Sequence, residues 1–289
     1  MSELWVIGNG FDLWHQLPTR YSDFYQFAKS TLNEVENYYD HELEHGGPWC
    51  DFENSLGNFL WSEFFDAHNH IDADAEDFRP SFVYGLEDEL TEQADQIVEA
   101  IKESFREWIQ GINISGVVRQ LELPDDALFV SFNYTSTLEE IYGIEVERIL
   151  HLHGRAAVFD DLIFGHGDTI EGEPELDENG DSNRTMFTDA ENAAKYPFHA
   201  LKKPVPEVLE KNKKFFDSLE HITEITVVGH SLNRVDLPYF RKLAESAPHA
   251  HWRVCCFSED ERIHHVEQLA NCGVSRDSIR ICSYAELQV

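Results

Sequence analysis

Basic residues are scarce in this chain of 289 residues: 22 lysines and arginines stand against 55 aspartates and glutamates, which gives a formal net charge of −33. A surface with this charge repels phosphate backbones, so broad nucleic-acid binding is disfavoured. A local pocket for a small anionic ligand is still allowed, because such a pocket needs only a few hydrogen-bond donors. The simplest interpretation of the acidity is a solvated surface.

Cysteine is also scarce, and the chain lacks a C-x-x-C pair, a long apolar run and a signal-peptide pattern at its first residues. The five cysteines are Cys50, Cys255, Cys256, Cys272 and Cys282. An odd number of thiols with this spacing is typical of a reduced protein, and neither a disulfide framework nor a zinc site is predicted. No apolar run approaches the ~20 residues that a membrane helix needs. We therefore expect a cytoplasmic protein with no membrane segment and no bound metal.

Hydrophobic residues make up 42% of the chain, and aromatic residues make up 12%. This composition is enough for a large folded core. Short, continuously apolar runs alternate with segments of helical periodicity. This alternation predicts an α/β fold: a doubly wound, mostly parallel, Rossmann-like sheet with helices on both faces. The expected strands span residues 3–7, 127–132, 148–153, 161–165, 224–228, 252–257 and 278–282.

The domain organisation follows from the position of the helical segments. Nothing between residues 21 and 112 reads as a strand, and the segment is long for an ordinary crossover. We predict one α/β domain over residues 1–289, with a helical insert over residues 19–115 after the first strand. The polar segment over residues 168–189 is either a lid over a site or a solvated loop.

Polar residues and glycines gather where the predicted strands end, and ligands bind outside the carboxyl ends of the strands in an open α/β sheet. Several independent loops with this composition point to a shared ligand site. The residues at these ends are Gly8, Asn9, Gly10, Phe11 and Asp12; Asn133, Tyr134 and Thr135; His151, His153 and Gly154; Gly165, His166, Gly167 and Asp168; and Gly229, His230, Ser231 and Leu232.

Each of these residues also has a purely structural interpretation. Gly8 and Gly10 fit a tight turn as well as a loop whose N–H groups approach a phosphate. Asn133 fits the cap of a short helix as well as a ligand contact, and Asp236 fits a helix N-cap.

The two histidines of His151-Leu152-His153 alternate along a predicted strand, so their side chains face opposite ways. We expect one of them to be packed and the other to be exposed in the cleft. Because His153 adjoins Gly154, it is the histidine that we expect in the cleft.

Two other chemistries compete with nucleotide binding. The run Gly229-His230-Ser231-Leu232-Asn233 is similar to the G-x-S-x-G elbow of α/β-hydrolases, but Asn233 replaces the last glycine. The acid and histidine that should follow the serine are also badly spaced. A metal site is the second competitor, with His151, His153, His166 and Asp168 as its ligands. We rank it below nucleotide chemistry, because the first two face opposite ways and no H-E-x-x-H motif is present.

Five motifs occur in a fixed order between residues 7 and 240: IGNGFDLWHQLPTRYSDF, SFNYTSTLE, HLHG, IFGHG and VVGHSLNRVDLPYF. Taken together they resemble the bacteriophage abortive-infection AbiH family over most of the chain. That family is similar in turn to the SIR2-like nucleotide-binding superfamily. The superfamily has a glycine-rich first loop, an Asn-containing loop, a His-Gly pair and a Gly-x-Ser-Leu run. Its pattern falls here on Gly8 and Gly10, on Asn133, on His153-Gly154 and on Gly229–Leu232.

The sequence departs from this pattern in one place and lacks one module. Thr135 stands where SIR2-like NAD hydrolases commonly have an aspartate, and the cysteine-rich zinc module of deacetylating sirtuins is missing. The resemblance therefore implies an antiphage effector that binds NAD, with cleavage of the nicotinamide–ribose bond preferred over protein deacetylation. It implies that Asn133 orients ribose or water and that His153 accepts a proton, a kind of catalysis worth about 10²–10⁴-fold.

The resemblance also implies the remaining ligand contacts. The first glycine loop would hold the pyrophosphate, Asp12 a ribose hydroxyl, Phe11 the wall of the nicotinamide pocket, and Gly229 with Ser231 the adenosine half. The full set of predicted cofactor-binding residues is Gly8, Asn9, Gly10, Phe11, Asp12, Thr135, Gly154, His166, Gly229, Ser231, Leu232 and Asp236.

We expect the protein to bind a nucleotide. A second copy of the chain and a phage-derived trigger are further candidate partners. Two alternatives to an NAD-consuming effector stay open at this point. One is a non-catalytic, nucleotide-sensing module whose insert contacts a partner, and the other is a serine hydrolase that acts through Ser231.

Overall fold

The computed structural model describes residues 3–41, 48–124, 126–170, 172, 174 and 176–287. The chain divides into two compact units. The first consists of Met1–Asp23, Arg106–Ile163 and Pro204–Val289, and the second of Phe24–Phe105 and Phe164–Lys203. The predicted insert over residues 19–115 falls mainly in the second unit, which also takes in residues 164–203.

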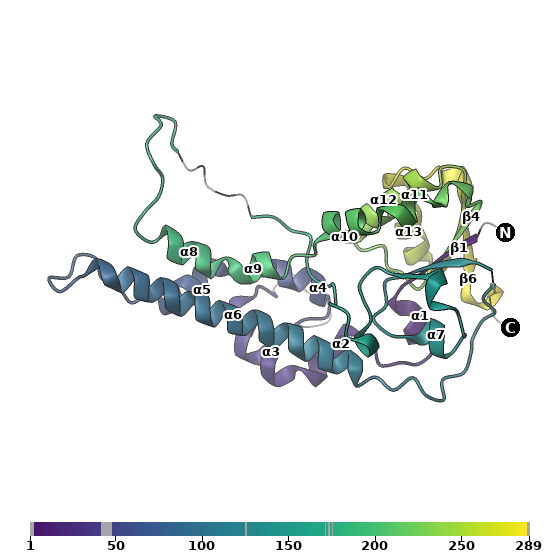
Figure 1. Cartoon of the computed structure of the whole chain (residues 1–289), viewed down its shortest axis with the longest axis horizontal. Helices are drawn as coiled ribbons and strands as arrows, with labels where there is room; N and C mark the ends of the chain where they lie inside the picture. Colours follow the sequence, from purple (N-terminus) through teal and green to yellow (C-terminus); the bar gives the residue numbers. More distant parts are fainter. Residues whose placement is uncertain are drawn as a thin grey trace. The chain divides into compact units, whose positions relative to one another are not determined.

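The first unit is built on one sheet of six parallel strands, which confirms the predicted fold class (Figure 1). The strands are β1 (Glu3–Ile7), β2 (Leu128–Ser131), β3 (Ile149–His151), β4 (Glu224–Val228), β5 (His251–Cys256) and β6 (Ile279–Ser283). Their order is β3-β2-β1-β4-β5-β6. The chain moves outward from β1 through β2 to β3 and then returns to the other side of β1, so the direction reverses between β1 and β4. Ligands bind at such a switch point in doubly wound folds.

Both faces of this sheet are buried, because side chains alternate along each strand. Leu4 and Val6 of β1 belong to one apolar cluster, and Trp5 and Ile7 belong to the other. The first cluster is covered by α10 (Val205–Lys211), α11 (Lys213–Asp217), α12 (Leu237–Ser246) and α13 (Glu259–Asn271). The second is covered by α1 (Asn9–Trp14) and α7 (Thr137–Glu140) (Figure 1). The carboxyl ends of β1, β2 and β4 are brought level by the register, in which Ile7 is paired with Ser131 and Val228.

The strand predicted over residues 161–165 is wrong. No strand forms here, although the N–H of Ile163 donates to the carbonyl of His153, beyond the end of β3, at 2.9 Å. The chain leaves the first unit directly after Ile163, so no ladder develops. An apolar run next to a unit boundary carries the same local signal as an edge strand.

The second unit is helical in its described part. Its helices are α2 (Tyr21–Phe27), which begins in the first unit, α3 (Lys29–Val35), α4 (Phe52–Ser55), α5 (Trp61–His68), α6 (Pro80–Gln110), which ends in the first unit, α8 (Thr188–Ala194) and α9 (Tyr196–Ala200). Aromatic rings form its core. The rings of Phe24, Phe52 and Phe105 contact one another, with centroid distances of 4.7, 5.3 and 5.6 Å. Phe105 also contacts Phe164 at 4.4 Å. The aromatic-rich sequence of the predicted insert is therefore explained by packing.

Short 3-10 turns complete the described chain: η1 (Glu36–Tyr38), η2 (Leu56–Asn58), η3 (Val146–Arg148), η4 (Ala156–Val158), η5 (Leu219–His221), η6 (Arg276–Ser278) and η7 (Tyr284–Glu286). Among the described residues, no helix combines the length and the apolar character that crossing a bilayer demands. Of the predicted lid over residues 168–189, residues 171, 173 and 175 lie outside the described residues. The described part has an isolated antiparallel bridge between Leu176 and Ser182.

Candidate functional site

The loops that follow β1 and β4 are in backbone contact at the switch point. The N–H of Gly10 donates to the carbonyl of Gly229 at 2.7 Å, and the N–H of Gly8 donates to Val228 at 3.0 Å. A Cβ on Gly10 would lie 2.8 Å from the Cα of Gly229, and a Cβ on Gly229 would collide with the backbone nitrogen of Phe11. Gly229 also has a φ of +71°, which favours glycine. The glycines are thus required for the close approach of two loops.

This contact bears on the phosphate role predicted for the first loop. The N–H groups of Gly8 and Gly10 already have acceptors in the protein, and the N–H of Phe11 donates to Gly8 at 2.9 Å. Their role as phosphate donors stays a prediction, and in this conformation these three donors are directed at protein carbonyls.

Asp12 lies at the centre of a buried hydrogen-bond network on the α1 and α7 side of the sheet. Its carboxylate accepts hydrogen bonds from Thr135, at 2.6 Å to Oδ2, and from Thr137, at 2.8 Å to Oδ1. Burial raises the pKa of Asp12 from 3.8 to about 6, against the hydrogen bonds from Thr135, Thr137 and Asn133, which act to lower it. Desolvation wins because the carboxyl is only 1% exposed. The network ties the loop after β1 to the loop after β2.

Asn133 is part of this network and has an unsatisfied acceptor. Its side chain hydrogen-bonds to Asp12, and its N–H donates to the Ser131 hydroxyl at 3.2 Å. Its side-chain carbonyl oxygen is buried and has no partner. The alternative prediction, that Asn133 caps the following helix, is wrong, because Ser136 occupies the N-cap position of α7. A buried acceptor without a partner costs about 1–3 kcal/mol, so an incoming donor at this atom would be favoured.

A second buried cluster lies on the opposite face of the sheet edge and joins His153, Asp236 and His230. The two carboxylate oxygens of Asp236 lie 3.7 Å from Nε2 of His153 and 3.6 Å from Nε2 of His230. Nδ1 of His153 donates to the carbonyl of Phe132 at 3.2 Å, whereas Nδ1 of His230 accepts from the N–H of Leu232 at 2.9 Å. His230 therefore carries its proton on Nε2, toward Asp236. Asp236 stands at the N-cap position of α12, as the structural interpretation expected, but its side chain does not cap the helix.

The predicted alternation of His151 and His153 is confirmed, and the predicted exposure of His153 is wrong. His153 is 2% exposed, with the ring of Tyr134 stacked on it at 5.8 Å and Phe132 edge-on at 5.1 Å. His151 lies on the other face and contacts Glu139 of α7 at 2.9 Å. Both histidines are packed, because the polar loops fold over the sheet edge from both sides.

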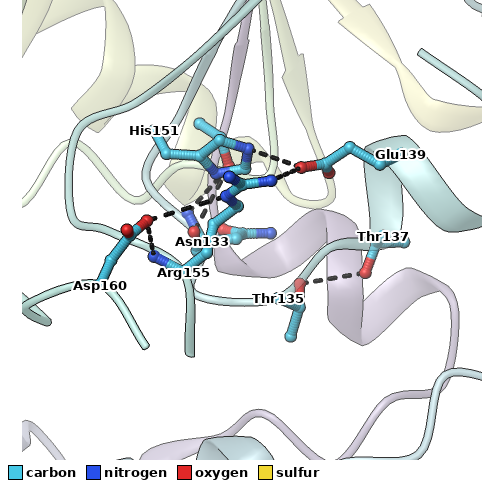
Figure 2. A network of polar contacts seen from close by, with 8 residues as sticks. Asn133, Thr135, Thr137, Glu139, His151, Arg155 and Asp160 are labelled. Atoms are coloured by element: carbon cyan, nitrogen blue, oxygen red, sulfur yellow. Dashed lines mark hydrogen bonds and ion pairs between the residues drawn. The ribbon is translucent and has the colours of Figure 1, made fainter. Parts of the chain in front are cut away.

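Glu139 forms hydrogen bonds with two side chains in the network of Figure 2. Its Oε1 accepts from Nε2 of His151 and from the Arg155 guanidinium, each at 2.9 Å. Burial acts to raise the pKa of Glu139, but the hydrogen bond and charge of His151, together with the hydrogen bond from Arg155, hold it below its usual range. Arg155 also contacts Asp160, at 3.8 Å from its Nε, and its own N–H donates to the same carboxylate at 3.1 Å. The loop after β3 is braced by these contacts.

A cavity of about 460 Å³ lies beside the loops that follow β2 and β3. It is lined by Ile109, Gln110, Ile112, Asn113, Ile114, Ser115, Tyr134, Thr135, Ser136, Glu140, Ala156, Ala157 and Phe159. All of these residues belong to the first unit. Thr135 connects the cavity to the buried network, because it lines the cavity and donates to Asp12.

The remaining predicted residues have the following places. Phe11 is fully buried and packs against His15 at 4.5 Å and Tyr142 at 5.6 Å, so the structure gives it a core position. The side chain of Asn9 donates to the carbonyl of Thr19 at 2.7 Å. Gly154, with a φ of +78°, begins the braced turn.

His166 lies in the second unit, where its Nε2 donates to the carbonyl of Phe198 at 2.7 Å. Its Nδ1 accepts from the N–H of Asp168 at 3.1 Å, so both ring nitrogens have protein partners within that unit. The binding roles predicted for all these residues stay predictions.

The loop around Ser231 does not have the geometry of a nucleophile elbow, which places its serine on a strained turn leading into a helix. Among the described residues, the left-handed backbone of this loop falls on Gly229 and on Leu232, with a φ of +53°, and not on Ser231. After β4, the next helix is α12, which begins only at Leu237. Ser231 is exposed, and His264 reaches its backbone carbonyl at 3.2 Å. Leu232 is fully buried.

The metal alternative finds no support in the described part of the chain, where no three histidine, cysteine or acidic residues are placed to share an ion. His151 and His153 have different partners on opposite faces of the sheet, as the strand alternation requires.

The set of residues predicted to bind or catalyse left out Thr137 of the Asp12 network, His230 of the Asp236 cluster, and Glu139 and Arg155 of the network in Figure 2. His230 had a readable signal, because it lies inside the Gly-His-Ser-Leu run of a strand end. Thr137 and Glu139 continue an alternation that begins at Asn133 and Thr135, but they fall in a predicted helix, where alternation predicts nothing. Their assembly depends on contacts across 12 to 125 residues of chain.

Comparison with known proteins gives one family. Neither the curated proteins nor the solved structures contain a match to this chain. The model of the family described as bacteriophage abortive infection AbiH matches residues 4–257, a span that includes every residue of the two buried clusters. The chain therefore belongs to the bacteriophage abortive infection AbiH family.

Proposed function

We propose that the carboxyl edge of the sheet binds a nucleotide, with NAD as the first candidate, and that the protein acts in abortive infection by hydrolysing the nicotinamide–ribose bond. Support comes from the position of the buried clusters. The Asp12 network and the Asp236 cluster flank the switch point between β1 and β4, where doubly wound folds bind ligands.

The observation that carries the proposal is the unsatisfied side-chain carbonyl of Asn133. Asp12 holds the amide by a hydrogen bond, so the carbonyl oxygen is left as a fixed acceptor. A ribose hydroxyl or an attacking water is a donor that would satisfy it. Buried polar groups are normally paired, and a catalytic or ligand-binding role is one of the reasons for an exception.

The proposed reaction converts NAD and water into nicotinamide, ADP-ribose and a proton. The bond from ribose to nicotinamide breaks through an oxocarbenium-like transition state, and the nicotinamide leaves as a neutral molecule. The protein has to position water and ribose, which is the role of Asn133, and to accept one proton. His153 and Asp236 are the proposed proton acceptor. The 3.7 Å between them is longer than a hydrogen bond, so a proton delivered between Nε2 and Oδ1 would close this gap.

The test measures binding and turnover separately on the full chain. Calorimetry with NAD reports binding, and chromatography of nicotinamide reports turnover. We expect Asn133→Ala to reduce turnover by about hundredfold or more and His153→Ala to remove it. Asn271→Ala, which changes an exposed asparagine at the end of α13, is the matched control and should behave as the wild type. Absence of both binding and nicotinamide release in the wild-type protein, with and without phage lysate as trigger, would refute the proposal.

A second function, nucleotide sensing without catalysis, is favoured by the burial of His153. Both of its ring nitrogens face protein groups, and Tyr134 covers one face of the ring. This alternative predicts binding of NAD with no release of nicotinamide, and a change of oligomeric state when NAD is added. Light scattering with and without NAD separates it from the hydrolase proposal.

A further inference from the structure

The turn that follows β3 holds an apolar ring in solvent. Phe159 is 75% exposed, and its φ of +59° places it in the left-handed region, which residues other than glycine rarely adopt. A large exposed aromatic ring gains nothing from burial, so the core does not explain its position.

The same turn is closed by hydrogen bonds on both sides of the ring. The N–H of Phe159 donates to Ala156 at 3.2 Å, and the N–H of Asp160 donates to Arg155 at 3.2 Å. The Asp160 carboxylate accepts from the N–H of Arg155, and the Arg155 guanidinium is held in turn by Glu139 (Figure 2). The charge of Arg155 is therefore compensated by two carboxylates. Its structural effect is to fix the turn that presents Phe159.

Phe159 stands at the wall of the 460 Å³ cavity, and the cavity has a second aromatic in Tyr134. The hydroxyl of Tyr134 donates to the carbonyl of Ile163 at 3.0 Å, so the orientation of this ring is also fixed. Isoleucines and alanines form the apolar part of the cavity wall. Gln110, Asn113 and Ser136 add polar groups that can form hydrogen bonds. A pocket with one ring held in place, a second ring on a hydrogen-bonded turn and a few polar groups suits a flat heteroaromatic ring.

The charge of the residues that line the cavity favours an aromatic ring of the ligand over a phosphate group. Among the described residues that line this cavity there is no lysine, arginine or histidine, and Glu140 contributes a carboxylate. A phosphate would lack a cationic partner there, whereas an uncharged or cationic ring would not be repelled. A cationic ring is additionally attracted to the face of an aromatic side chain.

We propose that this cavity is the subsite for the heteroaromatic ring of the nucleotide, and that Phe159 is the side chain on which the ring stacks. The inference rests on the proposed nucleotide-binding function and assigns one half of the ligand to a defined place. Thr135 lines the cavity and belongs to the Asp12 network, so a ring in the cavity would leave its ribose at the edge shared with the Asn133 loop.

NAD contains two heteroaromatic rings, nicotinamide and adenine, and the experiment shows which of them occupies the cavity. Calorimetry is run on the full chain with NAD, ADP-ribose, nicotinamide, N1-methylnicotinamide and adenine as probes. Phe159→Ala is expected to weaken the binding of ring probes by about tenfold or more, and Phe159→Tyr should restore it. If the cavity takes the pyridine ring, Phe159→Ala weakens NAD and N1-methylnicotinamide but leaves ADP-ribose unchanged. If it takes adenine, ADP-ribose and adenine are weakened as well.

The matched control is Val158→Ala, which changes the neighbouring exposed residue of the same turn, a residue that does not line the cavity. Equal affinities of the wild type, Phe159→Ala and Val158→Ala for every probe that binds would overturn the inference and leave the proposed function standing. Ring probes that bind in a Phe159-dependent way to a protein that does not bind NAD would refute the proposed function and keep the subsite. Circular dichroism of each variant confirms that the fold is intact.

Discussion

The hydroxyl of Thr135 donates a hydrogen bond of 2.6 Å to the carboxylate of Asp12, and so joins two residues that are 123 positions apart in the sequence. One end of this bond stands in α1, directly after the glycine loop of β1, and the other in the loop after β2. The bond is buried at both ends. It therefore fixes the relative position of two loops that together contribute half of the predicted site residues.

The carboxyl of Asp12 makes the stability of the protein depend on pH. The pKa of Asp12 is about 6 in the folded protein and 3.8 in the unfolded chain. Between these values only the folded state holds the proton, so the free energy of unfolding falls as the pH rises through this window, and the loss is complete above pH 6. The shift corresponds to about 3 kcal/mol.

Asp12→Asn removes this titration. We expect the difference in unfolding free energy between the wild type and Asp12→Asn to change in favour of the variant by up to about 3 kcal/mol from pH 4 to pH 7, measured by urea denaturation. Asp217→Asn, at an exposed carboxylate that ends α11, is the control. A difference that is flat with pH would contradict the assignment.

The contact between the glycine loops predicts a large effect of a single methyl group. Gly229→Ala introduces a Cβ into the backbone of Phe11 in addition to the strain of a positive φ, and we expect a loss of about 3 kcal/mol or more in unfolding free energy. Gly116→Ala has a similar φ of +82° but open space around its Cβ, and it should lose only about 1–2 kcal/mol. Equal losses in the two variants would show that the two loops are not in contact.

The second unit contains a buried ion pair whose removal tests its core. Nζ of Lys203 lies 2.7 Å from the carboxylate of Glu53, and these side chains are 0% and 7% exposed. We expect Lys203→Met to lose about 3–5 kcal/mol, because the Glu53 carboxylate then stays buried without this lysine. Combining it with Glu53→Gln should recover part of the loss. Lys202→Met, one residue earlier and less buried, is the control, and a loss of similar size there would contradict the account.

Protection against phage should follow the chemistry of Asn133. In bacteria that express the chain, we expect Asn133→Asp and Asn133→Ala to lose protection in a plaque assay, together with any fall in cellular NAD after infection. An aspartate at this position is nearly isosteric but adds a negative charge beside the Asp12 carboxyl, so it should fail without loss of fold. Full protection by both variants would remove Asn133 from the mechanism.

The sheet could be predicted from the sequence because the strands are short and mainly apolar runs, and six of the seven expected strands form. The run over residues 161–165 fails because local hydrophobicity cannot show that the chain passes from one compact unit to the other at Ile163. Part of the site could also be predicted from local sequence. Glycines and polar groups at strand ends are visible in the sequence, and the sheet brings most of them to one edge.

The partners within the site could not be predicted, since they depend on which helix faces each loop. Asp12 and Thr135 were both expected at the site, but not that the hydroxyls of Thr135 and Thr137 would donate to the two oxygens of Asp12. His153 was identified, whereas its burial under Tyr134 depends on the packing of the β2 loop. Phe159 carries no local signal at all, because its exposure and its backbone conformation result from the closure of a turn.

A crystal structure of the protein soaked with NAD tests the central claim most directly. The account predicts a nucleotide at the carboxyl edge of the sheet, with a ribose hydroxyl or a bound water donating to the side-chain carbonyl of Asn133 and one heteroaromatic ring against Phe159. A nucleotide bound elsewhere, or a carboxyl edge that stays empty at NAD concentrations that saturate known NAD enzymes, would contradict it.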